Sequence, residues 1–323
     1  FAKYQNTSNS ANNQNNSINT TNALYLKNTS NSTTRNIFID DKKTNLITTS
    51  KILKVTYFIP QMFSFFTHFP EHRRNFIDRL SFTRATPNNA KKFINNIRIF
   101  NKLSAERYKI INISITDYTL EHIENEMIKI FIEIMAIRIE TTIDLQQSLF
   151  EIKKEELPEL LINLYIKLDT YKSLKIPNNF TENYHKYSQK NHLKNLENLK
   201  THILSDTFKA ELIKIIKNTR KQDINIKSGS INLNLFELLT INKKNNLNIK
   251  HCSTGEQKMA LITILIAQKT DILLLDEVSS FLDNKNYNKV WNILKKRKIQ
   301  IISTSTSPLN IENIDNINLS EFN

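Results

Sequence analysis

Glycine is the residue that this sequence most conspicuously lacks. Gly229 and Gly255 are the only two glycines in 323 residues, whereas an average content of about 7% would give roughly 23. A phosphate-binding loop of the form G-x-x-x-x-G-K-[ST] needs glycines to bring backbone amides against the phosphates. The chain cannot contain such a loop, so by itself it is not expected to bind a nucleotide in the usual way.

Cysteine and long apolar runs are also scarce. Cys252 is the only cysteine, which excludes an intramolecular disulfide and fits a reducing compartment. The most apolar segment, residues 127–139, is interrupted by Lys129, Glu133 and Arg138 and is not expected to cross a bilayer. No signal-peptide pattern opens the sequence. We therefore expect a cytoplasmic protein without a membrane contact.

Positive charge is in excess, with a formal net charge of +14. Such a balance suits a polyanionic partner such as nucleic acid. The other explanation is an AT-rich coding sequence, which enriches Lys, Asn and Ile whatever the fold. Since the basic residues form only short clusters, at 153–154, 217–221 and 295–298, charge alone does not identify DNA.

The first third of the chain contains two kinds of segment. Residues 1–34 are mainly Asn, Ser and Thr and are expected to be disordered, because they cannot bury enough apolar surface to offset the entropy of ordering. Ile37 and Ile39, and then residues 54–59, have the pattern of strands, and Pro60 ends the second. We assign residues 35–69 to the remainder of an amino-terminal lobe.

The middle of the chain is predicted to be mainly helical. Within residues 88–153, apolar residues recur at steps of three and four, as on one face of a helix: Phe93, Ile97, Phe100 and Leu103, then Leu120, Ile123, Met127, Ile130, Ile134 and Ile137. The two helices either form an antiparallel hairpin or pack separately on a core. Residues 160–168 are a strand or a short helix, and 190–217 are helical. We assign residues 70–220 to a helical arm.

The last third alternates between strands and helices. Strands are expected near 231–235, at 272–276 and at 299–303, and helices at 254–268 and 285–295. This alternation is typical of a parallel α/β layer. We assign residues 221–323 to a second, carboxyl-terminal lobe.

Two carboxylates follow the apolar run Ile272-Leu273-Leu274-Leu275 directly. Asp276 and Glu277 would then lie at the carboxyl edge of a parallel sheet, where such folds bind ligands. In phosphoryl-transfer sites an aspartate holds Mg²⁺, and a neighbouring glutamate orients and deprotonates the attacking water. The simpler alternative is a strand that ends in an acidic turn.

The peptide Ser253-Thr254-Gly255-Glu256-Gln257-Lys258 precedes an apolar helical pattern. Ser253 and Glu256 have the spacing of a capping box, and the unpaired amides of a helix amino terminus attract anions. Capping boxes open many helices that bind nothing. The specific signal is the combination of this cap with Gly255, Gln257 and the acidic strand.

Together these residues carry a resemblance to a known family. Residues 253–258 resemble the signature motif of ATP-binding-cassette (ABC) ATPases in its RecF and SMC-like form, and 271–278 resemble their Walker B strand. Residues 280–283 resemble the D-loop, and 301–306 the strand and switch region that follow. More narrowly, Pro60-Gln61-Met62 and residues 73–80 resemble the RecF family. The similarity covers residues 36–310.

The resemblance implies an incomplete ABC-type P-loop ATPase head, without its Walker A lobe, that carries a mainly helical arm. ATP and Mg²⁺ are the implied cofactors. Asp276 would hold Mg²⁺, and Glu277 would act as general base. Asp283 would lie at the dimer contact, and Thr304 or Thr306 at the switch position. The signature residues would contact the γ-phosphate of ATP that is bound to a partner protomer: Ser253, Gly255, Glu256 and Gln257.

The resemblance also implies a role in DNA replication, recombination and repair, including the SOS response. Such a protein would bind DNA at junctions of single and double strands, form an ATP-dependent homodimer, hydrolyse ATP slowly and act with recombination mediator proteins. Arg73 and Arg74 could contact DNA phosphates, although a solvated helix face would explain them equally well. The alternatives are a catalytically inactive ABC-like scaffold and the ATPase subunit of a membrane transporter. Such subunits are compact, and the helical region before the signature argues against them.

The sequence departs from the family pattern in one further place. The family carries Gly-x-His-Arg ahead of the signature, whereas this chain has Gly229-Ser230-Ile231-Asn232. Three explanations remain: a truncated record of a working ATPase, a split protein whose P-loop lies on another chain, or an eroding gene product. Phe at position 1 favours the first and indicates a longer reading frame. The missing His and Arg and the low glycine content favour the last.

Overall fold

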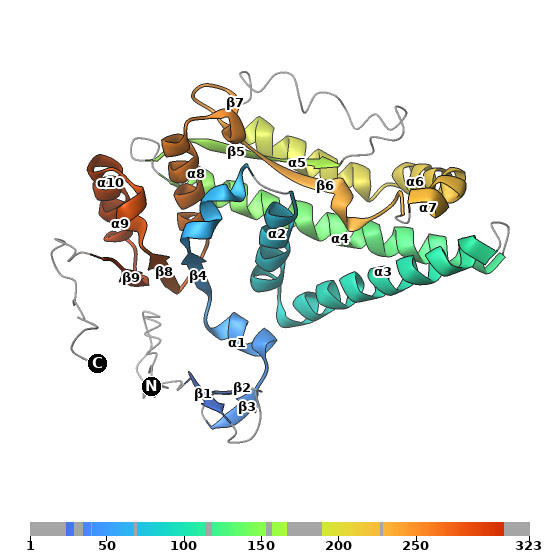
Figure 1. Ribbon diagram of the computed structural model, residues 1–323, viewed down its shortest axis with the longest axis horizontal. Coiled ribbons are helices and arrows are strands. Elements are labelled where there is room, and N and C mark those ends of the chain that lie inside the picture. The colour runs from blue at the N-terminus through green and yellow to red at the C-terminus, as the bar shows by residue number, and fades with distance from the viewer. Residues whose placement is uncertain are drawn as a thin grey trace, which may run out of the picture.

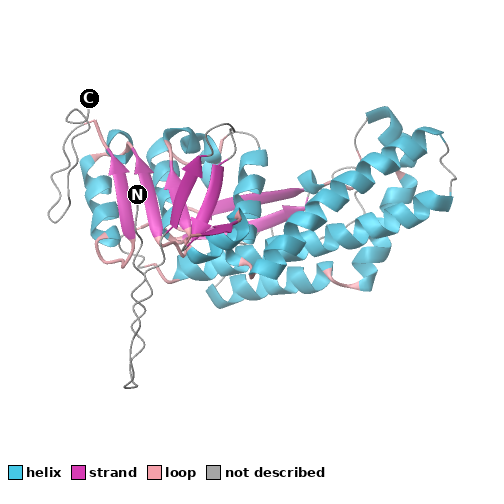
Figure 2. Ribbon diagram, turned by 90° about the horizontal axis from the view of Figure 1, so that it is seen from below, coloured by secondary structure: helices cyan, strands magenta, loops and turns pink. Residues whose placement is uncertain are grey.

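The computed structural model describes residues 24–28, 35–39, 41–67, 70–113, 118–152, 157–166, 189–226 and 229–306. It is a mixed α/β structure with a parallel sheet at one end and a long helical hairpin that extends away from it (Figure 1). An antiparallel sheet lies between these two parts (Figure 2). The predicted fold class, an α/β head with a mainly helical arm, is confirmed.

The parallel sheet consists of β4 (Val55–Phe58), β8 (Ile272–Asp276) and β9 (Gln300–Thr304), in that order. All three strands run in the same direction, with Leu273 paired to Ile301 and Asp276 to Thr304. Their bounds agree with the predicted strands to within one residue. The sheet places Asp276 at its carboxyl edge, as expected.

The two faces of this sheet differ in burial. On one face Phe58, Leu273 and Leu275 belong to the hydrophobic core. On the other, large apolar side chains are exposed, and Ile302 reaches 50%: Val55, Tyr57, Leu274 and Ile302. Parallel sheets normally have both faces covered. Within the described residues, this sheet therefore has one packed face and one open face.

The segments around the acidic strand also fold as the sequence predicts. The chain passes through η5 (Ile249–His251) into α8 (Thr254–Ile266) before β8, and α9 (Val278–Phe281) and α10 (Asn284–Leu294) follow it. Eight consecutive residues of α8, 259–266, are buried, so this helix is embedded in the core. Trp291 is buried in α10 beside Tyr287.

The antiparallel sheet contains β5 (Leu160–Ile166), β6 (Phe236–Asn242) and β7 (Leu247–Asn248). The prediction of a strand at 231–235 is wrong: residues 233–235 form a 3₁₀ turn, η4 (Leu233–Leu235), because the Asn232 side chain accepts a hydrogen bond from the Asn234 backbone at 2.9 Å. The strand begins one residue later. Since β5 pairs with β6, the proposed boundary at residue 220 separates two strands of one sheet.

A small antiparallel sheet begins the described chain. It consists of β1 (Leu24–Asn28), β2 (Arg35–Ile39) and β3 (Lys42–Thr44). The expectation of disorder over 1–34 is therefore wrong for residues 24–28, because Leu24 and Leu26 begin an alternating pattern that pairs with β2. The other residues of that segment lie outside the described part. After β3 come α1 (Leu46–Ile52), β4 and η1 (Pro60–Phe65).

The arm is an antiparallel hairpin of α3 (Pro87–Ile113) and α4 (Tyr118–Phe150), preceded by α2 (Pro70–Arg84). This decides between the two predicted arrangements in favour of the hairpin. The helices α5 (Gln189–Ile203), α6 (Asp206–Asn218) and α7 (Arg220–Ile226) pack along it (Figure 1). None of the helices in the described part is both long and apolar enough to cross a membrane.

A buried ionic network joins three helices of the arm. Arg107 of α3 contacts Glu124 of α4 at 2.9 Å and Asp223 of α7 at 2.7 Å. Arg220 adds a second ion pair to Glu124 at 2.6 Å, and Arg107 also donates to the Ile216 carbonyl. Glu124 and Asp223 are both buried, so the loss of Arg107 would remove an ion pair from each of them in the interior.

Replacing Arg107 with Met should destabilise the fold strongly. The substitution leaves Glu124 and Asp223 short of a partner in the interior, which costs about 3–5 kcal/mol. Lys217→Met is the matched control, because Lys217 pairs with Glu121 at the surface and such pairs contribute little. Urea denaturation followed by circular dichroism measures both. Equal midpoints for the two variants would contradict a structural role for the network.

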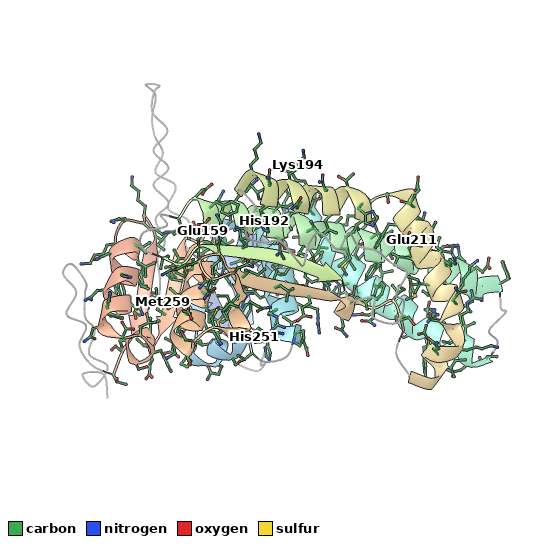
Figure 3. All side chains as sticks on the ribbon, turned by 90° about the horizontal axis from the view of Figure 1, so that it is seen from above. Glu159, His192, Lys194, Glu211, His251 and Met259 are labelled. Carbon is green, nitrogen blue, oxygen red and sulfur yellow. The ribbon has the colours of Figure 1, made fainter. Side chains whose placement is uncertain are left out.

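The fold should also lose stability in mild acid through His192, which is labelled in Figure 3. Burial lowers the pKa of His192 to about 4, against the opposing effect of its hydrogen bond to the Ile162 carbonyl. The unfolded chain takes up this proton near pH 6.5, so the contribution is complete above that pH and disappears as pH falls towards 4. The loss is about 3 kcal/mol.

Denaturation series between pH 7 and pH 4 test this contribution. His192→Gln keeps a donor for the Ile162 carbonyl but cannot titrate, so it should flatten the pH dependence in this window. His122→Gln, at an exposed position of α4, should keep it. A wild-type pH profile that His192→Gln leaves unchanged would show that the loss arises elsewhere.

Candidate functional site

The signature peptide forms the capped amino terminus of α8. Ser253 is the N-cap, and its hydroxyl accepts a hydrogen bond from the Glu256 backbone at 3.4 Å. The Glu256 carboxylate in turn accepts from the Ser253 backbone at 3.0 Å, which completes the predicted capping box. Figure 3 labels His251 and Met259, the exposed and buried residues on either side of this turn. The helix end itself is exposed and can receive an anion.

Gly255 lies in the first turn of α8 without a local reason to be glycine. It is exposed, and its φ is not in the left-handed region. A Cβ built at this position would meet no atom within 4 Å. Glycine in a helix costs about 0.5–1 kcal/mol relative to alanine. In a chain that contains two glycines, this one exposes a patch of helix backbone that nothing within the described residues requires.

The neighbouring signature residues fix the turn in place. The Gln257 side chain donates to the Cys252 carbonyl at 2.9 Å, which ties the helix to the chain before it. Glu256 Oε1 also lies 3.4 Å from side-chain amides of Asn242 and Asn245. Glu256 and Gln257 are thus committed to internal contacts. The Ser253 hydroxyl also donates to Glu256 at 2.9 Å, although the residue is exposed. The exposed backbone at Gly255 is the part of the motif that carries no side chain.

Lys258 connects the signature helix to the D-loop segment, a link that the sequence patterns did not predict. Its ammonium group donates to the Phe281 carbonyl at 2.8 Å and lies 5.7 Å from the centre of the Phe281 ring. Phe281 ends α9, two residues before Asp283. The only sequence signal was the place of Lys258 at the end of the signature peptide.

The acidic end of β8 lies against the end of β9. Thr304 donates its hydroxyl hydrogen to Asp276 Oδ1 at 2.6 Å. The Glu277 backbone N–H lies 3.2 Å from both the hydroxyl and the carbonyl oxygen of Thr304. The structure therefore brings Thr304 to the acidic pair, whereas exposed Thr306 lies two residues beyond. Ser279 and Ser305, which no motif singled out, form a second bridge at 3.0 Å.

Glu277 has a strained backbone. Its φ of 49° and ψ of 34° are left-handed, a conformation that costs a non-glycine residue about 1–2 kcal/mol. The strain turns the chain sharply from β8 into α9. Within the described residues, no hydrogen bond or ion pair engages the Glu277 carboxylate. Such strain is often found where a side chain is held for a function.

Asp283 caps α10 and stays exposed. Its carboxylate accepts from the Asn286 backbone and side chain, both at 2.8 Å. The backbone hydrogen bond from Asn286 lowers the pKa of Asp283 below its ordinary value. The residue is therefore an ionised cap on the surface, and this placement leaves it free to meet a partner.

The two arginines of α2 differ in their surroundings. Arg73 is 7% exposed, and its guanidinium contacts the Phe65 carbonyl at 3.1 Å and Glu237 at 2.9 Å. These internal contacts leave it in no position to grip a DNA phosphate. Arg74 is partly exposed, and burial together with the charge of Arg138 lowers its pKa. Of the pair, Arg74 is the one that can reach an external group.

The acidic residues fit a divalent cation but do not enclose one. Asp276, Glu277 and Thr304 offer carboxylate and hydroxyl oxygens, which Mg²⁺ prefers. No group of three or more His, Cys, Asp or Glu within the described residues could form a complete metal site. One or two carboxylates with open positions is the arrangement that Mg²⁺ uses beside nucleotide phosphates. The donor set therefore suits Mg²⁺ held jointly with a ligand.

The signature and the acidic edge form two separate parts of a site. Each is internally ordered, but within the described residues no hydrogen bond joins residues 253–257 to Asp276 or Glu277. Their link is indirect, through Lys258 and Phe281.

Comparisons with known proteins agree with this architecture. No family model and no curated protein matches the sequence. Among solved structures, the chain is similar to the recombination mediator protein RecF of the RecFOR pathway in its RecF-ATPrS form, at 14% identity and a TM-score of 0.59, over 90% of this chain and 72% of that one. The RecF-ATP structure matches at 15% identity and a TM-score of 0.57, over 86% and 69% of the two chains.

A third similar structure is an Smc head domain with an extended coiled coil from Pyrococcus furiosus, bound to the C-terminal domain of ScpA. Its identity is 13% and its TM-score 0.34, over 84% of this chain and 62% of that one. The two RecF matches show a shared fold. The chain therefore shares its α/β fold and helical arm with the RecF structures.

Proposed function

We propose that the chain belongs to an ATP-gated, DNA-associated ATPase that acts like RecF in DNA replication and recombinational repair. Two protomers would close on ATP, with the end of α8 on one facing the acidic edge of the other. Hydrolysis would be slow and would release the dimer from DNA at junctions of single and double strands. Recombination mediator proteins would be its partners.

The observation that carries this proposal is the unexplained glycine at the capped end of α8. Neither the backbone conformation nor the packing around Gly255 requires glycine. A Cβ would, however, stand between the helix backbone and an anion that approaches the exposed amides. A γ-phosphate presented by a second protomer would supply the missing reason. Ser253 would add its hydroxyl to the same contact.

The acidic edge supplies the complementary half. Asp276 would hold Mg²⁺, which neutralises the phosphate charge when bound. The open carboxylate of Glu277 would orient the attacking water and take its proton. Thr304, the last residue of β9, is hydrogen-bonded to both residues and would keep them in place. A change at the site would thereby move the end of β9. Asp283 would meet the partner across the dimer contact.

The glycine-rich loop has to come from polypeptide outside residues 1–323, since this sequence cannot form one. The open sheet face supports that requirement, because among the described residues nothing covers Tyr57, Leu274 and Ile302, whereas parallel sheets normally have both faces covered. A strand and helix that bring the loop would cover it. The coding sequence around residue 1 is the first place to look for a G-x-x-x-x-G-K-[ST] peptide.

One observation favours the second candidate, an inactive scaffold with the same surfaces. Where the family carries His and Arg, this chain has Ile231, which is buried in the core, and Asn232, whose side-chain amide donates to the Gly229 carbonyl at 2.7 Å. Between them and Gly229, Ser230 donates its backbone N–H to buried Asp223 at 2.9 Å. The segment has become part of the packing between α3 and α7. Absence of a phosphate-binding loop from the complete gene would decide for the scaffold.

Gly255→Ala separates folding from function. Alanine should leave the free energy of unfolding unchanged or raise it by up to about 1 kcal/mol, because the position is helical and open. ATP-dependent dimerisation, measured by light scattering in an assembly that includes the phosphate-binding loop, should be lost. The control is the opposite substitution in another helix, Ala210→Gly in α6, which should lower the free energy of unfolding and leave dimerisation unchanged. Dimerisation that Gly255→Ala does not alter would contradict a phosphate contact at this helix end.

Glu277→Gln should trap the ATP-bound dimer. The amide keeps the shape of the side chain but cannot take a proton, so the dimer should form and persist while phosphate release falls at least about 100-fold. Size-exclusion chromatography with ATP and Mg²⁺ shows the trapped species. The control is Glu211→Gln on α6 (Figure 3). If the Glu277 variant turns ATP over at the wild-type rate, Glu277 is not the base.

A further inference from the structure

The outer face of α3 is uniformly neutral or basic. The fully exposed residues of this helix include five cations and no acid: Lys91, Lys92, Arg98, Lys102 and Lys109. Its acidic residue, Glu106, is partly buried and pairs with Lys102 at 3.8 Å. The helix packed beside it is different, since α4 exposes three acids, Glu121, Glu140 and Asp144, against one cation, Lys129. A general excess of lysine codons does not produce this separation of charge between neighbouring helices.

Four of these cations form one straight stripe. Lys91, Arg98, Lys102 and Lys109 are separated by seven, four and seven residues, which is close to whole turns at 3.6 residues per turn. They therefore lie on one side of the helix over a length of about 27 Å, at 1.5 Å per residue. On the opposite side, Phe93 and Phe100 are buried in the core. We call these four residues the α3 stripe.

The stripe is largely unpaired. Within the described residues, Lys91, Arg98 and Lys109 have no acidic partner within ion-pair distance, and the pair of Lys102 with Glu106 is a surface pair of the weak kind. Lys92, outside the stripe, is held by Glu133 at 3.1 Å. Charges that lie in a line and have no partner of their own repel one another. An external polyanion would remove that repulsion.

We propose that the α3 stripe is the surface on which the arm binds the phosphate backbone of duplex DNA. This rests on the proposed function and locates the DNA contact within it. A straight row of about 27 Å matches a stiff duplex that carries one charge per about 1.7 Å of axis. A membrane surface fits less well, because the apolar side of α3 is packed against α4 and cannot enter lipid.

Single-stranded DNA fits less well too. Binding of single strands generally adds aromatic side chains on which bases stack, and the exposed residues of α3 include no aromatic. The stripe offers charge alone, which grips a backbone and does not read sequence. Duplex DNA of any sequence is therefore the expected ligand, and the arm would lie along it.

The test compares two variants of equal charge. One replaces the α3 stripe with glutamine at Lys91, Arg98, Lys102 and Lys109. The other makes the same change at four exposed lysines of α5 and α6: Lys190, Lys194, Lys209 and Lys214. Glutamine is a good helix former, and circular dichroism checks both folds. Fluorescence anisotropy with a 30-base-pair duplex and a 30-nucleotide single strand, between 50 and 200 mM NaCl, measures affinity.

The stripe variant should bind the duplex at least about tenfold more weakly, and its slope of log K against log salt should be shallower by about 3 to 4, since each lost phosphate contact removes about 0.9. The α5 and α6 variant should keep the wild-type slope. Equal losses in both variants, or a loss confined to the single strand, would overturn the assignment of the stripe. If the wild-type protein binds neither DNA, the proposed function itself fails at its DNA step.

Discussion

The structure depends on the burial of one helix, α4. Nineteen of its residues are buried, and it packs against α2, α3, α5, α6, β5 and α8. A helix covered on so many sides has to be apolar around most of its circumference, and its few interior charges have to be paired. Arg138 meets Asp78 of α2 at 2.7 Å, and Glu124 meets Arg107 and Arg220. These pairs set the rotation of α4 and hence the position of every element around it.

Local patterns in the sequence were sufficient to predict a single helix, strand or cap. The capping box of α8, the strand before Asp276 and the helices of the arm each carry their signal within a few residues. The strand at 236–242 was missed because the apolar alternation of Ile231, Leu233 and Leu235 ahead of it has the same period, and an Asn232 side-chain contact turns that segment instead. Pairing of β5 with β6 was not predictable, since it joins residues at least seventy positions apart.

The site was predictable in its parts but not in its connections. Residue types at fixed spacing predicted that Ser253 caps a helix and that Asp276 ends a strand, whereas the roles of these residues and of Gly255 and Glu277 towards a ligand stay predictions. That Thr304 would bond Asp276, or that Lys258 would reach Phe281, follows from how β8, β9 and α9 are placed in space. Arg73 was predicted as a DNA contact, but its long side chain turns inward to Glu237. A positive charge in a sequence does not reveal which way it points.

The open face of the parallel sheet affects how the protein meets other chains. Within the described residues, Tyr57, Leu274 and Ile302 leave an apolar surface open to water beside the outer edge of β9, which pairs with no other described strand. Apolar faces and strand edges of this kind favour pairing with another chain, so whatever covers this face would also protect the protein from aggregation.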